Sequence, residues 1–169
     1  MFGNKSDNTY KKLAQALKDN LGSDDVVIIS TDMSHYPKFE DANKIDLVTL
    51  EKIKSGEVAE LEKYVKEVEG AGYANEQTVL CGLDAVKTVM ELANLAGWNE
   101  IEILQYANSG EAPSIGDKRQ VVGYGAVAFT QVENTKAIPP TPFIKGANAN
   151  ATSTKATVTG ELNSEQQKI

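Results

Sequence analysis

The sequence has few residues that bind metals or react as nucleophiles: among 169 residues it has one cysteine, Cys81, and one histidine, His35. A single cysteine excludes an intrachain disulfide and a structural zinc site made of several cysteines. Most transition-metal sites in proteins need three or four ligands, so these two residues can supply only part of one. Carboxylates, or residues outside this chain, would have to complete it.

Long apolar runs are also absent. No uninterrupted run approaches the roughly 20 residues of a membrane-spanning helix, and the first residues lack the apolar stretch of a signal peptide. These absences favour a cytoplasmic protein with no membrane partner. The net charge is −7 and the lysines are interspersed with acidic residues, so no nucleic-acid partner is expected.

The residues that are present predict one α/β domain over residues 1–132, with a mixed sheet flanked by helices. Helices are expected at about 7–20, with Ser6 or Asp7 as the cap, and at 42–55, 57–68 and 77–95. Strands are expected at 25–30, 101–107 and 121–130. Because residues 26–29 are all apolar, the first strand is predicted to be buried on both faces. Gly123 and Gly125 in the last strand indicate a bulge, or the close approach of a helix or ligand.

The composition changes after residue 132. Residues 133–160 are rich in Pro, Thr, Asn, Ala and Ser, which predicts a low-complexity linker. Residues 161–169 begin like a capped helix and are interpreted as the start of a following domain or as a disordered tail.

Asp32 and His35 follow the predicted strand at 25–30, and strand ends are where α/β proteins usually bind ligands. Cys81 lies near the start of the helix at 77–95, where the helix dipole favours a negative charge on its sulfur. The two can be a Cys–His catalytic pair oriented by Asp32, or parts of a metal site. They can also be a structural histidine and a small buried thiol, and spacing does not rank these alternatives.

Four sequence blocks, taken together, resemble one family. They are STDMSHY at 30–36, TVLCG at 78–82, YANSG at 106–110 and VVGYGAVAF at 121–129. In this order they resemble the Memo family, whose prokaryotic members are called AmmeMemoRadiSam system protein B. The resemblance implies a fold like that of the class III extradiol (LigB-type) dioxygenases.

The resemblance also implies functional residues. It makes Cys81 a metal ligand and places Asp32 and His35 in the pocket as catalytic residues, next to iron or copper. It adds Ser34, Asn108 and Ser109 as pocket-lining residues. The implied function is that of a metal-binding redox or dioxygenase-like protein, and whether the chain is an enzyme stays open. The alternative is a non-catalytic adaptor whose pocket holds an anionic or phosphopeptide ligand.

Full-length members of the family have an N-terminal half with two further pocket histidines. The resemblance therefore implies that this chain is the C-terminal portion of the domain, with an incomplete fold. Its expected partners are the missing N-terminal half and the radical-SAM and AMME-candidate-region components of the same system.

Overall fold

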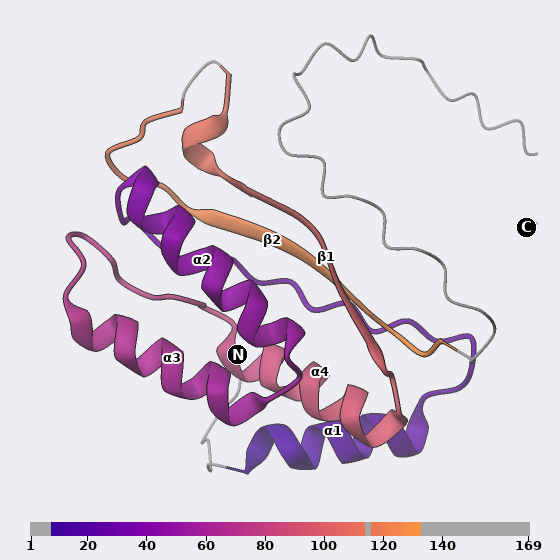
Figure 1. Cartoon of the computed structure of the whole chain (residues 1–169). Helices are drawn as coiled ribbons and strands as arrows, with labels where there is room; N and C mark the ends of the chain where they lie inside the picture. Colours follow the sequence, from indigo (N-terminus) through magenta and orange to yellow (C-terminus); the bar gives the residue numbers. More distant parts are fainter. Residues whose placement is uncertain (1–7, 114–115, 133–169) are drawn as a thin grey trace, which may run out of the picture. The chain divides into compact units, whose positions relative to one another are not determined.

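The structure, a computed structural model, describes residues 8–113 and 116–132. In chain order the elements are α1 (Thr9–Asn20), α2 (Phe39–Lys54), α3 (Val58–Ala71), α4 (Leu83–Ala96), β1 (Glu100–Asn108), the short 3-10 helix η1 (Ser109–Glu111) and β2 (Gly123–Thr130). Helix α2 packs along both strands, α3 packs on α2, and α1 packs on α4 (Figure 1). The expected α/β class is confirmed.

The helices form where apolar residues recur at helical spacing. In α4, Val86, Met90 and Ala93 are all buried, as expected for a stripe that faces the core. Gly72 and Gly97 end α3 and α4 in the left-handed conformation that glycine adopts without strain. The core joins α2, α3 and α4 to the strands and to residue 33. Its buried members are Met33, Ile45, Leu50, Ile53, Leu61, Val65, Val68, Val79, Leu80, Val86, Met90 and Ile103.

The sheet of the described residues is an antiparallel pair, β1 with β2, so the expected mixed sheet is not found there. The pairing runs from Glu100 opposite Thr130 to Asn108 opposite Gly123, with a register shift between Ile103 and Gln105. Leu104 is the extra residue at this bulge, and its side chain is 58% exposed. The strand expected at 101–107 is present, and the one expected at 121–130 begins two residues later.

The segment at 25–30 contradicts the sequence prediction, because it is neither a strand nor buried on both faces. Val26 is 81% exposed and Ile28 is 84% exposed, whereas Ile29 packs against the core. The apolar run indicated burial correctly for one face only. Among the described residues, nothing covers the other face.

The last predicted helix starts later than expected, at Leu83 rather than at about residue 77. Residues 77 and 78 instead bond to His35: the His35 N–H donates to the Thr78 carbonyl at 2.9 Å, and the Gln77 N–H donates to the His35 carbonyl at 3.1 Å. This long-range pairing is incompatible with a helix. The error matters because it places Cys81 before the helix rather than inside its first turns.

Several predictions lie outside the described residues: the Ser6 or Asp7 cap, the linker at 133–160 and the segment at 161–169. In the described part of the chain, no helix has the length and apolar character needed to cross a membrane.

Candidate metal centre

The segment after residue 30 is held between two others by backbone hydrogen bonds. On one side His35 pairs with Thr78, and on the other it pairs with Val122. Two further bonds join Met33 N–H to the Gly123 carbonyl at 2.9 Å and Gly123 N–H to the Ser34 carbonyl at 3.0 Å. These bonds bring the 30–36 block beside the 78–82 and 121–129 blocks, which are far apart in the sequence.

This pairing brings Asp32, His35 and Cys81 together. One ligand atom from each, a carboxylate oxygen, an imidazole nitrogen and the thiol sulfur, lies within 4.8 Å of the other two. Asp32 Oδ2 is 3.5 Å from His35 Nε2. The Asp32 side chain is 47% exposed, the His35 side chain is 22% exposed and Cys81 is exposed. The three side chains therefore form one wall of a site that is open to solvent on the other side.

Thr31 fixes the position of Cys81 relative to Asp32. Its hydroxyl accepts the Gly82 N–H at 2.8 Å, donates to the Asp32 carbonyl at 3.0 Å and lies 3.3 Å from Cys81 Sγ. A Cβ atom on residue 82 would come within 2.5 Å of the Thr31 hydroxyl oxygen, so only glycine allows this approach. Gly82 is also the N-cap residue of α4, which places Cys81 one residue before the cap.

The donor set fits a transition-metal ion. His35 Nε2 is buried and has no hydrogen-bond partner among the described residues, although Asp32 lies 3.5 Å away. An unpartnered buried nitrogen is costly, and coordination to a metal would use its lone pair. Nitrogen, oxygen and sulfur ligands together suit zinc, iron or copper better than magnesium or calcium. Three ligands on one wall leave further coordination positions to other groups.

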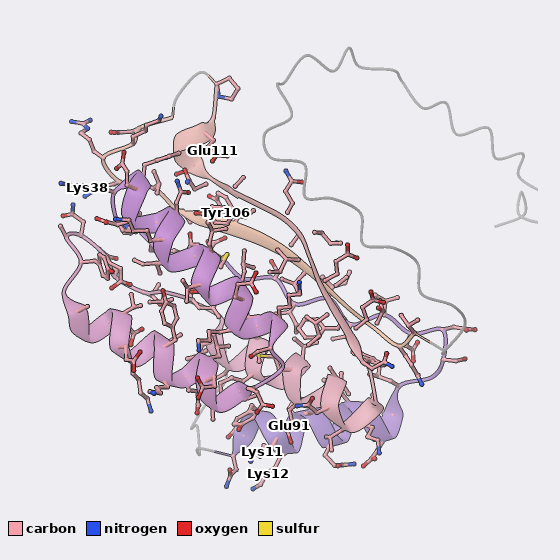
Figure 2. The ribbon with its side chains drawn as sticks, in the orientation of Figure 1. Lys11, Lys12, Lys38, Glu91, Tyr106 and Glu111 are labelled. Atoms are coloured by element: carbon pink, nitrogen blue, oxygen red, sulfur yellow. The ribbon has the colours of Figure 1, made fainter. Side chains whose placement is uncertain are left out.

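Beneath this wall lies a buried carboxylate that sequence reasoning missed. Asp46 of α2 is fully buried and accepts hydrogen bonds from the Ser34 N–H and hydroxyl, each at 3.0 Å, and from the Tyr106 hydroxyl at 2.8 Å. Tyr106 lies on β1 and reaches towards α2 (Figure 2). Burial raises the pKa of Asp46, against the opposing effects of these hydrogen bonds and of His35. Burial and the Asp46 charge likewise raise the pKa of Tyr106.

The other predicted pocket residues form internal hydrogen bonds. Ser34 is fully buried against Asp46. The Asn108 side chain accepts the Gly110 N–H and donates to Asn43, each at 2.9 Å, and Ser109 Oγ accepts the Val122 N–H at 3.0 Å. Asn108 and Ser109 thus support the turn after β1 and its contact with the 121–129 block. Their role as pocket-lining residues stays a prediction.

A family model described as Memo-like protein matches residues 1–128. The chain belongs to this family. It is 31% identical over 128 residues to a MEMO1 family protein of Methanopyrus kandleri, covering 72% of this chain and 40% of that protein. It is 36% identical over 104 residues to one of Methanobrevibacter smithii, covering 61% and 33%. For one of Aquifex aeolicus the identity is 31% over 117 residues, covering 69% and 39%.

The chain therefore spans at most about two fifths of these three Memo-family relatives, since the matched shares of their lengths are 40%, 33% and 39%. All four sequence blocks that indicated the family start within the matched residues.

Proposed function

We propose that this Memo-family chain contributes Asp32, His35 and Cys81 to a site that binds iron or copper, in a fold of the LigB type with redox or dioxygenase-like chemistry. The observation that carries the proposal is the meeting of three different ligand types within 4.8 Å. One of them is a buried His35 nitrogen that has no hydrogen-bond partner in the part of the chain that the structure describes. A bound metal of this kind supplies Lewis acidity and one-electron chemistry.

Each residue of the wall has a distinct part. Cys81 offers a thiolate, a soft ligand that favours copper and iron. His35 offers its Nε2 atom. The backbone pairing of His35 with Thr78 and Val122 fixes the position of the backbone from which the imidazole ring extends. Asp32 is more exposed than His35, so it can ligate the metal or hold a proton for a substrate that enters from solvent.

The open side of the site is where we expect the N-terminal half of the family domain. Ile29, Thr31 and Met33 line a partly open, mainly apolar pocket of about 80 Å³. Alternation along an extended segment then turns residues 26, 28, 30 and 32 the other way. Val26 and Ile28, both highly exposed, thus form an apolar stripe that leads to Asp32. A partner that covers this stripe would reach the metal wall and could supply further ligands.

The alternative, a non-catalytic module that holds an anion or phosphopeptide in the same pocket, has less support. The wall brings together a carboxylate, a thiol and an imidazole. Asp32 carries a negative charge that repels a phosphate, whereas phosphate sites usually use Arg, Lys or backbone N–H groups. The same side chains suit a cation.

The test is metal binding by the 169-residue chain, with and without the part of the M. smithii relative that lies outside the aligned region. Under anaerobic, reducing conditions we expect one iron, copper or probe Co²⁺ ion per complex and a thiolate-to-cobalt charge-transfer band. Cys81→Ser should abolish the band and weaken binding at least about tenfold. Ser30→Ala, a change at an exposed neighbour of the site, should leave both unchanged. Absence of stoichiometric metal in the complex would overturn the proposal.

A further inference from the structure

Asp46 is a buried ionisable residue that is not one of the three proposed metal ligands. Its carboxylate is fully buried in the core face of α2. It accepts three hydrogen bonds, two from Ser34 and one from Tyr106. Three donors aimed at one carboxyl group fit the ionised form, which only accepts hydrogen bonds.

A carboxylate at this position is costly for a core. Burial penalises its charge, and an apolar side chain on the same face of α2 would carry no such cost. The buried carboxylate also requires a glycine at position 123, because a Cβ atom there would collide with Asp46 Oδ2. A stability role alone explains neither the charge nor the glycine.

Two of the three hydrogen bonds that Asp46 accepts come from Ser34, which lies between two proposed ligands. Ser34 directly precedes His35 in the sequence, and only Met33 separates it from Asp32. Asp46 holds Ser34 by its backbone N–H and by its side chain, so it restrains both the backbone and the side-chain orientation there. Gly123, packed against the same carboxylate, is itself bonded to Met33 and Ser34 through its backbone.

We propose that Asp46 is a positioning residue for the metal wall: through Ser34 it fixes the backbone that sets the separation and direction of the Asp32 and His35 side chains. The inference rests on the proposed function in one respect: a metal must bind at Asp32, His35 and Cys81 for its affinity to report their geometry. Tyr106 has an auxiliary role, since its hydroxyl orients Oδ2 of the same carboxylate.

The first test measures Co²⁺ affinity in the complex described above. Asp46→Asn keeps the shape of the side chain and removes its charge, and should weaken Co²⁺ binding about 10- to 100-fold, with the cobalt spectrum altered. Tyr106→Phe removes one hydrogen bond and should have a smaller effect in the same direction. Thr49→Val is the matched control, because Thr49 is also fully buried on α2, and within the described residues its hydroxyl bonds only to the Ile45 carbonyl. It should leave the affinity unchanged.

The second test needs no metal. In the metal-free 169-residue chain, hydrogen exchange at the Ser34 amide should accelerate at least about tenfold in Asp46→Asn. Thr49→Val should leave it unchanged. If the unaltered complex binds no Co²⁺, the proposed function fails and this exchange measurement alone decides whether Asp46 restrains Ser34.

Three results would overturn the inference. The first is unchanged Ser34 exchange in Asp46→Asn. The second is faster exchange together with unaltered Co²⁺ affinity and spectrum in a complex that binds the ion. The third is an equal loss of affinity in Thr49→Val, which would make the effect one of general stability. Should Asp46→Asn not fold, Tyr106→Phe is judged by the same criteria.

Discussion

At the scale of single residues, the site depends on positions that have no side chain. Gly82 lets the Thr31 hydroxyl approach the start of α4, and Gly123 lets α2 press the Asp46 carboxylate against the backbone of β2. Gly125 likewise leaves room for Leu50 and Met33. The sequence left open whether Gly123 and Gly125 marked a bulge or a close approach. The structure assigns them to close approach of α2 and Met33, and the bulge lies on β1 instead.

Gly123→Ala tests this tight packing. The added methyl group would collide with Asp46 Oδ2, and the carboxylate cannot move away without losing its bonds to Ser34 and Tyr106. We expect a loss of about 1–3 kcal/mol in the free energy of unfolding, measured with urea. The control is Gly70→Ala in α3, where a Cβ meets nothing within 4 Å. It should gain about 0.4–1 kcal/mol, so a similar loss in both variants would contradict the explanation.

Thr31→Val tests the hydroxyl that joins the Asp32 and Cys81 segments. Valine keeps the shape but leaves the partly buried Gly82 N–H without its acceptor, which should cost about 1–3 kcal/mol of unfolding free energy. Thr31→Ser keeps the hydroxyl and should retain most of the stability. Equal stability of the valine and serine variants would show that the hydroxyl contributes nothing.

The raised pKa of Asp46 predicts a pH dependence of stability. Burial favours the protonated form of Asp46. At pH values between the ordinary pKa of 3.8 and the raised pKa, the native chain therefore holds a proton that the unfolded chain releases. The unfolding free energy of the unaltered chain, relative to Asp46→Asn, should therefore fall as pH rises through this window. Urea unfolding of both chains at a series of pH values measures the difference. A difference that grows with pH would mean that the Asp46 pKa is lowered.

At the scale of elements, local sequence patterns predicted the helices and strands whose positions depend on nearby residues. The four helices and the β1–β2 pair arise from apolar spacing and from glycines at their ends, and their positions agree with the sequence within a few residues, apart from the start of α4. The predicted start of α4 was wrong because residues 77 and 78 pair with His35, more than 40 positions away. A short stretch of sequence around residue 77 gives no sign that its backbone bonds to His35 instead of forming a helix.

The same limit explains which parts of the site could be predicted. Asp32 and His35 stood out as polar residues after an apolar run, and Cys81 as the one thiol, but only the family resemblance indicated that they meet. Asp46 follows Ile45 on an amphipathic helix, where a charged residue normally faces solvent. Its burial depends on Ser34 and Tyr106, at separations of 12 and 60 residues. Sequence spacing carries no signal of that network.

Lys87 tests how α1, α3 and α4 are joined. Its side chain is 8% exposed. The ammonium group pairs with Glu62 of α3 and Asp84 of α4, and lies 4.3 Å from the centre of the Tyr10 ring of α1. Burial alone would lower the pKa of Lys87, but the stronger combined effect of Glu62 and Asp84 raises it. The stability that this pairing contributes is therefore fully present below pH 10.5, the ordinary pKa of lysine, and is lost as the pH rises through the raised pKa of Lys87.

Lys87→Met keeps the side-chain length and removes the charge. We expect a loss of about 1–2 kcal/mol of unfolding free energy near neutral pH, a modest value because Glu62 is partly exposed and can be hydrated. Lys63→Met is the control, because the Lys63–Glu67 pair on α3 lies at the surface and should contribute little. A similar effect of the two changes would argue against a special role for the junction.

At the scale of the whole molecule, we propose that the exposed apolar stripe of Val26 and Ile28 belongs to an interface. Isolated exposed apolar residues are ordinary, but Val26 and Ile28 alternate with side chains that face the core and lead directly to Asp32. The matched region is 40% or less of the three relatives described above, so most of each relative is available to cover such a surface. Among the described residues, the proposed metal wall is open to solvent and nothing covers the apolar stripe. A single partner surface that covers both would explain the two observations together.

Ile28→Asp separates this explanation from incidental exposure. Because Ile28 is 84% exposed, the change should alter the unfolding free energy of the 169-residue chain by no more than about 0.5 kcal/mol. Association with the remaining part of the M. smithii relative, measured by calorimetry, should weaken at least about tenfold, because the charge would be buried against apolar surface. Leu47→Asp on α2, where the leucine is 47% exposed, should leave association unchanged. Equal binding of Ile28→Asp and the unaltered chain would place the interface elsewhere, and Asp32 would then face solvent rather than a partner.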